Sequence, residues 1–119
     1  MCGGCLNQLQ HAMIELRRYQ LEDERTPITE WLAELRDVRA RAQIEVRLRR
    51  VSAGNFGDCK TVGDGISELR IDIGAGYSVY YGKHGQDLVL LLCGGNKGTQ
   101  QTDIALAKNY WLDWKRRNS

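Results

Sequence analysis

The sequence predicts one α+β domain in which helices pack on an antiparallel sheet, and three observations predict it. The chain has 119 residues, of which 42% are hydrophobic and 27% charged, and this composition suits a single globular core. Segments with the period of a strand alternate with segments that have the period of a helix. Three strand-like segments also follow one another with short turns, and such strands pair antiparallel.

The first half of the chain predicts one strand and two helices. Ile14 and Leu16 alternate with charged residues, as in an amphipathic strand. Thr26-Pro27 predicts the start of a short helix, because proline is tolerated in the first helical turn. Asp37 then predicts the cap of a longer helix over about 38–53, which has an arginine-rich outer side.

The second half predicts three strands and a last helix. Apolar and polar residues alternate over 68–73 and 77–81, with glycine-containing turns after each segment. Residues 88–93 are apolar throughout, which predicts a strand covered on both faces. The glycine-rich residues 94–98 predict a flexible loop, and a helix follows over about 102–116.

The expected order is therefore strand, two helices, three-strand meander and C-terminal helix. We expect the helices to cover one face of the sheet. Part of the other face then stays open to solvent. Outward side chains such as Arg70 and Tyr80 are expected to line it.

The domain boundaries and the expected location follow from composition. We expect residues 1–12 to be a loosely ordered leader and residues 13–119 to form a single domain. No secretory signal is visible, and the longest apolar run is far below the roughly 20 residues that cross a bilayer. The sequence therefore predicts a cytoplasmic protein without a membrane partner.

The charge of the chain is unevenly distributed. Its 17 Lys and Arg against 15 Asp and Glu give a net charge of only +2. Residues 31–60 and 108–119, however, each carry a net charge of +3. If these two segments meet in space, they form a surface that can hold phosphates. The alternative is a solvated helix face.

Metal and histidine chemistry have little support in the sequence. Cys2 and Cys5 form a C-x-x-C pair, but a zinc site needs two further ligands at matching spacing. Neither His11 nor His84 belongs to a catalytic motif. We therefore expect no metal and no cofactor.

Basic and aromatic side chains instead favour single-stranded nucleic acid. Arg70 and Lys97 can reach one rim of the predicted sheet, where they would hold phosphates, and tyrosines can stack on bases. The alternatives are solvated surface charge for the cations and ordinary strand packing for the tyrosines.

A set of motifs in a fixed order also resembles a known family. The motifs are Trp31-Leu32-x-x-Leu35-Arg36-Asp37, Gly54-Asn55-Phe56-Gly57-Asp58-x-Lys60, Gly63-Asp64-Gly65-Ile66-Ser67-Glu68-Leu69-Arg70-Ile71, Gly74-x-Gly76-Tyr77-x-Val79-Tyr80-Tyr81, Leu91-Leu92-Cys93-Gly94-Gly95-Asn96-Lys97-x-x-Gln100 and Asp103-Ile104. Over about residues 13–115 the chain thereby resembles the addiction-module killer proteins, the HigB-like branch of the RelE/ParE toxin superfamily.

This resemblance implies a RelE-like fold and a type II toxin neutralised by a cognate antitoxin, often a helix-turn-helix protein similar to HigA. RelE and HigB members cut messenger RNA in the ribosome, whereas ParE members inhibit DNA gyrase. The HigB-like branch favours a metal-independent endoribonuclease with the ribosome and mRNA as partners. The alternatives are a gyrase inhibitor without catalysis of its own and an attenuated toxin that mainly binds its antitoxin.

The resemblance also implies roles for particular residues. Arg70 and Lys97 match positions of basic groups around the scissile phosphate, and Asp103 or Tyr81 would move protons. The residues expected to bind RNA are Lys60, Tyr80, Ser78 and Lys83. The family motif carries arginine where this chain has Ser78, and loss of one such donor costs about 10²–10³ in rate.

Overall fold

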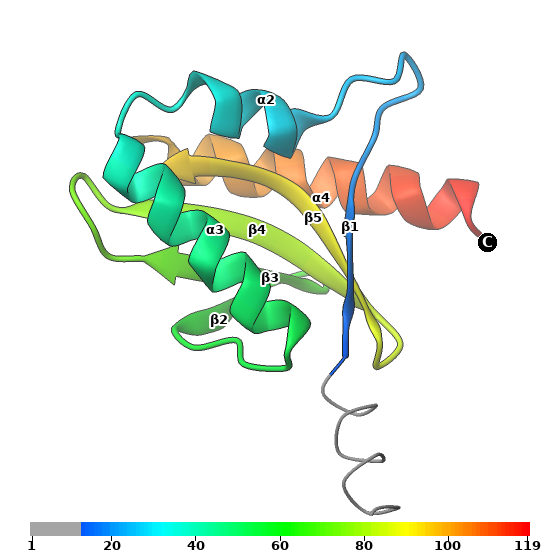
Figure 1. The fold of residues 1–119 in the computed structure, drawn as a ribbon. Coiled ribbons are helices and arrows are strands. Elements are labelled where there is room, and N and C mark those ends of the chain that lie inside the picture. The colour runs from blue at the N-terminus through cyan, green and yellow to red at the C-terminus, as the bar shows by residue number, and fades with distance from the viewer. Residues whose placement is uncertain (1–12) are drawn as a thin grey trace, which may run out of the picture.

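The computed structural model describes residues 13–119, which fold as one sheet with helices on both faces (Figure 1). The leader expected over 1–12, with Cys2 and Cys5, lies outside the described residues. The elements in chain order are β1 (Glu15–Arg18), α2 (Pro27–Glu34), α3 (Val38–Ser52), β2 (Cys59–Gly63), β3 (Ile66–Ile71), β4 (Tyr77–His84), β5 (Leu88–Asn96), the 3-10 turn η1 (Lys97–Thr99) and α4 (Gln100–Arg117). The expected α+β class is confirmed.

The sheet has the strand order β1-β5-β4-β3-β2. Strands β2 to β5 form an antiparallel meander. The first strand, β1, pairs parallel with β5, with Glu15 opposite Leu88. The prediction of an antiparallel sheet with a three-strand meander is therefore wrong in two details: the sheet is mixed, and the meander has four strands.

The strand that the sequence did not predict is β2. It lies at the edge of the sheet, and four of its five residues are exposed. An edge strand with little buried surface needs no alternation of apolar and polar residues, so its sequence carries no strand period. Its pairing with β3 supplies the backbone hydrogen bonds that fix it.

Helices cover both faces of the sheet, which corrects the expectation of one open face. Helices α2 and α3 pack on one face, where Ile28, Ile44 and Leu69 belong to one apolar cluster. Helix α4 packs on the other face and appears behind the sheet in Figure 1. Its Trp111 belongs to the cluster that buries Tyr80 completely. Tyr80 is therefore core, because α4 occupies the face on which it was expected to be exposed.

The glycine-rich segment is strand rather than flexible loop. Strand β5 continues through Gly94 and Gly95 to Asn96. A Cβ atom at Gly94 would collide with the Trp31 ring, and one at Gly95 would collide with the Asp103 carboxylate. The glycines therefore serve close packing on both faces of the strand.

The two helices expected from capping and periodicity are confirmed with small changes of length. Helix α3 begins where predicted, because the Asp37 side chain accepts a hydrogen bond of 3.0 Å from the Ala40 amide. Helix α4 begins two residues earlier than expected, at Gln100. Of the helices in the described part of the chain, none combines the length and apolarity that spanning a membrane requires.

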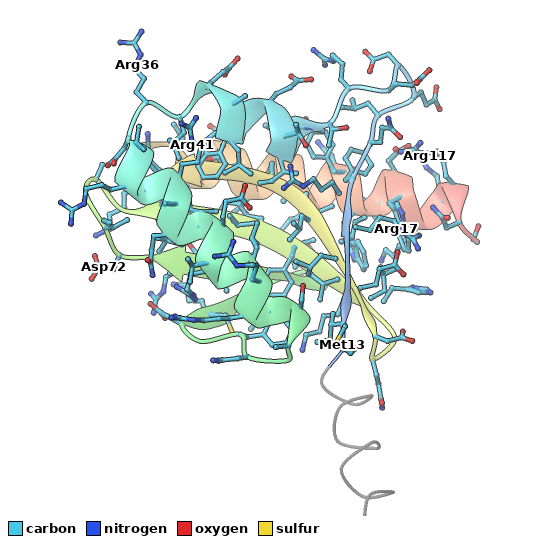
Figure 2. All side chains as sticks on the ribbon, in the orientation of Figure 1. Met13, Arg17, Arg36, Arg41, Asp72 and Arg117 are labelled. Atoms are coloured by element: carbon cyan, nitrogen blue, oxygen red, sulfur yellow. The ribbon has the colours of Figure 1, made fainter. Side chains whose placement is uncertain are left out.

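Labelled arginines of the two positively charged segments lie on different parts of the molecule. Arg36, from the first segment, and Arg117, from the second, lie at opposite ends of the molecule (Figure 2). The Arg117 guanidinium is bound to Asp113 at 2.7 Å and to the Gln20 backbone oxygen at 2.7 Å. Arg117 therefore fastens α4 to the segment after β1, whereas Lys108 of the same charged segment pairs with Asp64, in the turn after β2.

Candidate functional site

A polar pocket of about 280 Å³ lies at the end of the sheet next to the first turn of α4. Arg70 comes from β3 and Ser78 from the paired position of β4, so the register sets them side by side. Lys97 comes from η1 and Gln100 from the start of α4. The side chains that line this pocket include Asp58, Arg70, Tyr77, Ser78, Lys97 and Gln100.

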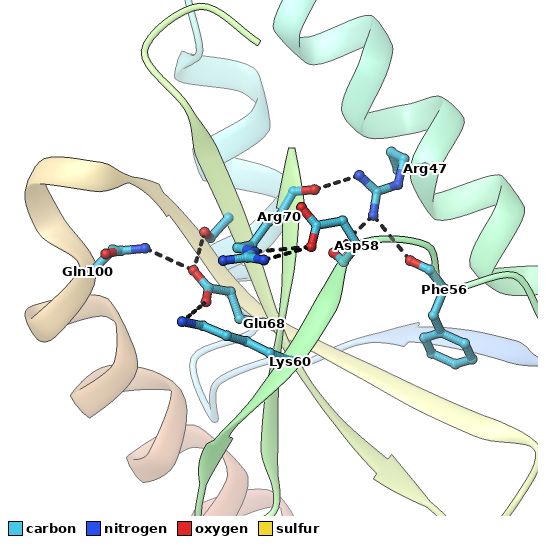
Figure 3. A network of polar contacts seen from close by, with 8 residues as sticks. Arg47, Phe56, Asp58, Lys60, Glu68, Arg70 and Gln100 are labelled. Atoms are coloured by element: carbon cyan, nitrogen blue, oxygen red, sulfur yellow. Dashed lines mark hydrogen bonds and ion pairs between the residues drawn. The ribbon is translucent and has the colours of Figure 1, made fainter. Parts of the chain in front are cut away.

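Arg70 is the fixed cation of the pocket. Its Nε and Nη2 atoms donate to Asp58 Oδ1 at 3.2 and 2.9 Å, as Figure 3 shows. These hydrogen bonds raise the pKa of Arg70 above its ordinary value. The side chain is 46% exposed, so a ligand can reach the charged group.

The loop that carries Asp58 is held by an arginine of α3. Arg47 donates to the backbone oxygens of Arg70 at 2.5 Å, Phe56 at 3.1 Å and Asp58 at 3.2 Å (Figure 3). These bonds tie α3, β3 and the loop before β2 together. Arg47 therefore fixes the position of the Arg70–Asp58 pair without lining the pocket.

Lys97 is the second cation, and within residues 13–119 it forms no ion pair. Its aliphatic part lies against Gly76, where a Cβ atom would come within 2.9 Å of Lys97 Cε. Gly76 also has a φ of +83°, which disfavours other residues. Glycine at this position thus allows the lysine to lie across the turn between β3 and β4.

Glu68 lies beneath the pocket and is only 1% exposed. Its Oε2 atom accepts hydrogen bonds from the Ser78 hydroxyl at 2.5 Å and from the Gln100 amide at 2.9 Å. Its Oε1 atom is 4.0 Å from the ammonium group of Lys60 (Figure 3). Lys60 is thus connected to the site through Glu68.

Tyr81 and Lys83 lie on the other face of the sheet. Tyr81 belongs to the cluster formed with α2 and α3, and burial raises the pKa of its hydroxyl. The Lys83 ammonium lies 4.4 Å from the centre of the Phe56 ring, which itself packs against Tyr81. Neither side chain lines the pocket that contains Arg70 and Lys97.

Tyr80 and Asp103 lie on the α4 side but not on the pocket wall. The buried Tyr80 hydroxyl has no hydrogen-bond partner among residues 13–119, and burial raises its pKa to about 12. The Asp103 carboxylate accepts a hydrogen bond of 2.5 Å from Thr99 and so supports the start of α4. The structure brings together Arg70, Lys97 and Ser78 in the pocket, with Lys60 beside it.

Several side chains of the site received no role from the sequence. Glu68 and Arg70 are two residues apart in one strand, so their side chains lie on the same face, and this signal could have identified Glu68. Gln100 and Asp58 lie within the motifs, but their residue types alone indicate no chemistry. The sequence around Arg47 is that of an amphipathic helix, in which an arginine is an ordinary surface residue.

The pocket suits a single anionic group better than a run of phosphates. Arg70 and Lys97 supply two positive charges, but the carboxylates of Asp58 and Asp72 also line the pocket. Among the described residues, no group of three or more His, Cys, Asp and Glu side chains could hold a metal ion. The arrangement can therefore hold one phosphate by charge and hydrogen bonds from the protein.

Comparison with known proteins identifies a relative. Over 78 residues the chain is 55% identical to an uncharacterized protein of Haemophilus influenzae, and the match covers 66% of this chain and 79% of that protein. No protein-family model matches the chain, and no solved structure matches it.

Proposed function

We propose that the pocket carries the function of this protein. The chain belongs to the same family as the uncharacterized Haemophilus influenzae protein, and the name of that relative indicates no activity. The function is that of a toxin that cuts messenger RNA on the ribosome and is neutralised by a cognate antitoxin. The fold proposed with it is RelE-like. Support for this fold comes from the element order, with β1, two helices, a meander and a last helix.

The observation that carries the proposal is that Arg70 and Lys97 line one pocket. They come from positions 27 residues apart in the sequence, and the sequence resemblance matched both to the surroundings of a scissile phosphate. Arg70 presents a planar guanidinium that can bind two phosphate oxygens, whereas Lys97 presents a point charge. Two such groups suit a phosphate that gains negative charge during the reaction.

The proposed reaction is attack by the RNA 2′-hydroxyl on the adjacent phosphate. Arg70 and Lys97 bind the phosphate oxygens, where charge accumulates in the transition state. Lys60, which is 57% exposed, binds the RNA backbone beside the pocket. The ribosome holds the RNA in position, and positioning alone supplies about 7–11 kcal/mol. Tyr81 has no role in this proposal, because it lies in the core on the other face.

Primer extension on an mRNA bound to translating ribosomes tests this proposal. The purified protein should produce defined cuts within the translated region. Arg70→Ala and Lys97→Ala should each reduce the single-turnover cleavage rate by about 10²–10³, as loss of one preorganised donor does.

Arg25→Ala is the matched control for these variants. Arg25 is exposed, pairs with Asp23 and lies outside the pocket, so its loss should leave the cuts unchanged. Absence of cuts by the protein itself, on ribosomes that a known nuclease does cut, would contradict the proposal. Equal losses in the control and the pocket variants would also contradict it.

A second candidate function is that of an attenuated toxin that mainly binds its antitoxin. The observation that favours it is the number of carboxylates around the cations. Asp58 is bound to Arg70, and the buried Glu68 has the short Ser78 side chain beside it, where the motif of the toxin family that the sequence resembles has arginine. The carboxylates thus oppose the binding of a phosphate.

Ser78→Arg distinguishes the two candidates. In an attenuated toxin, the added guanidinium restores a donor, so the cleavage rate should rise by about 10²–10³. In an active toxin that uses Ser78 itself, the rate should fall. The same ribosome assay measures both outcomes, and growth arrest on expression gives an independent readout.

A further inference from the structure

The Ser78–Glu68 pair forms a path from the pocket to a buried carboxylate. Ser78 lines the pocket, and Glu68 lies directly behind it with 1% exposure. The distance of 2.5 Å between the serine Oγ and the glutamate Oε2 lies at the short end of the range for hydrogen bonds between oxygen atoms. This geometry matches a hydroxyl whose proton can pass to a carboxylate.

We propose that Ser78 is the catalytic proton relay of the site and that Glu68 is the positioning residue that receives the proton through it. The proposal rests on the RNA-cleavage function above. Neither residue was expected to have this role, since the resemblance implies proton transfer by Asp103 or Tyr81. The structure binds the first to Thr99 and buries the second on the opposite face.

The relay keeps atoms and charge in balance. The 2′-hydroxyl passes its proton to Ser78 Oγ while the serine proton moves to the Glu68 carboxylate. The 2′-oxygen forms a bond to phosphorus, and the bond from phosphorus to the 5′-oxygen breaks. Water supplies a proton to the 5′-oxygen, and the glutamic acid returns its proton to solvent through Ser78.

The surroundings of Glu68 suit a proton acceptor better than a purely structural group. Burying a carboxylate costs free energy unless a partner neutralises its charge. At a purely structural position, an apolar side chain would serve equally well. The cation nearest to Glu68 is Lys60, at 4.0 Å, with 57% of its side chain exposed. Gln100 donates to the same oxygen as Ser78 and so keeps the carboxylate facing the serine.

Single-turnover cleavage of ribosome-bound mRNA tests the relay with four variants: Glu68→Gln, Ser78→Ala, their double variant and Ser78→Thr. The two single variants should each lower the rate by about 100-fold, the size of a general base contribution. The double variant should lose no more than either single one, because the two groups act as a unit. Ser78→Thr keeps the hydroxyl and should retain most of the rate.

Binding is measured separately from chemistry. The probe is an mRNA with a 2′-deoxynucleotide at the cleavage position, bound to the same ribosomes. Its Kd should stay within about twofold for all four variants, because Arg70 and Lys97 still hold the phosphate. Glu45→Gln and Ser52→Ala make the same chemical changes on α3, outside the pocket, and should leave both rate and Kd unchanged.

The outcomes separate the relay from the proposed function. Full cleavage by Ser78→Ala together with lost cleavage by Arg70→Ala would overturn the relay alone. So would additive losses in the double variant, or a threonine variant no better than alanine. Absence of cleavage by the unaltered protein would overturn both proposals. Should Glu68→Gln fail to fold, the comparison of Ser78→Ala with Ser78→Thr still decides the matter.

Discussion

At the scale of single residues, Arg47 joins helix α3 to two other segments, because its guanidinium donates to three backbone oxygens from those segments. The sequence placed it on an amphipathic helix but gave no sign of these partners, since backbone oxygens carry no residue-specific signal. Arg70 and Lys97 could be predicted as candidate phosphate-binding residues, because the charge of a side chain is known directly from the sequence. Glu68 lies between these cases: its position was predictable, whereas its burial depends on how α4 packs.

Arg47→Lys should destabilise the protein although it preserves the charge. An ammonium group cannot span the three oxygens that the planar guanidinium binds, so at least one of these hydrogen bonds is lost. The expected loss is about 1–3 kcal/mol in the free energy of unfolding, measured by urea denaturation. Arg49→Lys, on an exposed position of the same helix, is the control and should change little. Equal effects of the two substitutions would contradict the role of Arg47.

Tyr80→Phe should leave stability unchanged or raise it by up to about 1 kcal/mol, because it removes a buried hydroxyl without a partner. Tyr19→Phe is the matched change. The Tyr19 hydroxyl donates to Asp113 at 2.6 Å, so its removal should cost about 0.5–1.5 kcal/mol. Thermal and urea unfolding measure both. A clear loss of stability in Tyr80→Phe would mean that its hydroxyl has a partner after all.

At the scale of elements, the helices and strands that bury apolar residues could be predicted from the sequence, whereas strand β2, which buries almost none, could not. Helix α3 has a clear period, because one side of it faces the core. Strand β4 alternates between apolar and polar residues in its first half, although residues on both of its faces are buried. Strand β2 has no period, because it is an exposed edge. The glycines at the end of β5 were interpreted as loop residues, since a sequence does not reveal that a Trp ring and a carboxylate lie against them.

Gly82→Ala tests the packing of α4 on the sheet. A Cβ atom at this position of β4 would lie 2.6 Å from Cε3 of Trp111, so the helix or the ring must move. The expected cost is about 1–3 kcal/mol, as in other overpacked cores. In a double-mutant cycle with Trp111→Leu, part of this cost should disappear, because the smaller side chain relieves the clash. Strictly additive effects would show that the two positions do not touch in solution.

At the scale of the whole molecule, the prediction that failed was the placement of the helices. Helices on one face and helices on both faces share the same element order, and only the packing of Trp111 and Ala107 against β4 and β5 decides between them. That choice also shapes the site. Because α4 packs on the second face, the pocket lies at the end of the sheet, beside the first turn of this helix.

Acid should loosen the contact between α4 and the segment after β1. The hydrogen bond from Tyr19 lowers the pKa of Asp113, so the folded state holds this carboxylate charged more readily than the unfolded state does. A carboxylate whose pKa is lowered on folding stabilises the protein above about pH 4. This stabilisation is lost as the pH falls through the pKa of the folded state. Asp113→Asn should therefore flatten the fall of Tm between about pH 5 and pH 2. An unchanged acid slope would contradict this contribution.

The parallel pairing of β1 with β5 also constrains how a newly synthesised chain reaches its final shape. Leu16 cannot meet Val89 until more than half of the polypeptide has been made, and closure of so long a loop is slow. Until then β1 lacks its partner strand, and its Arg17 and Arg18 side chains discourage association with other nascent chains. The sheet can thus be completed at the β1 edge only after β5 has been made.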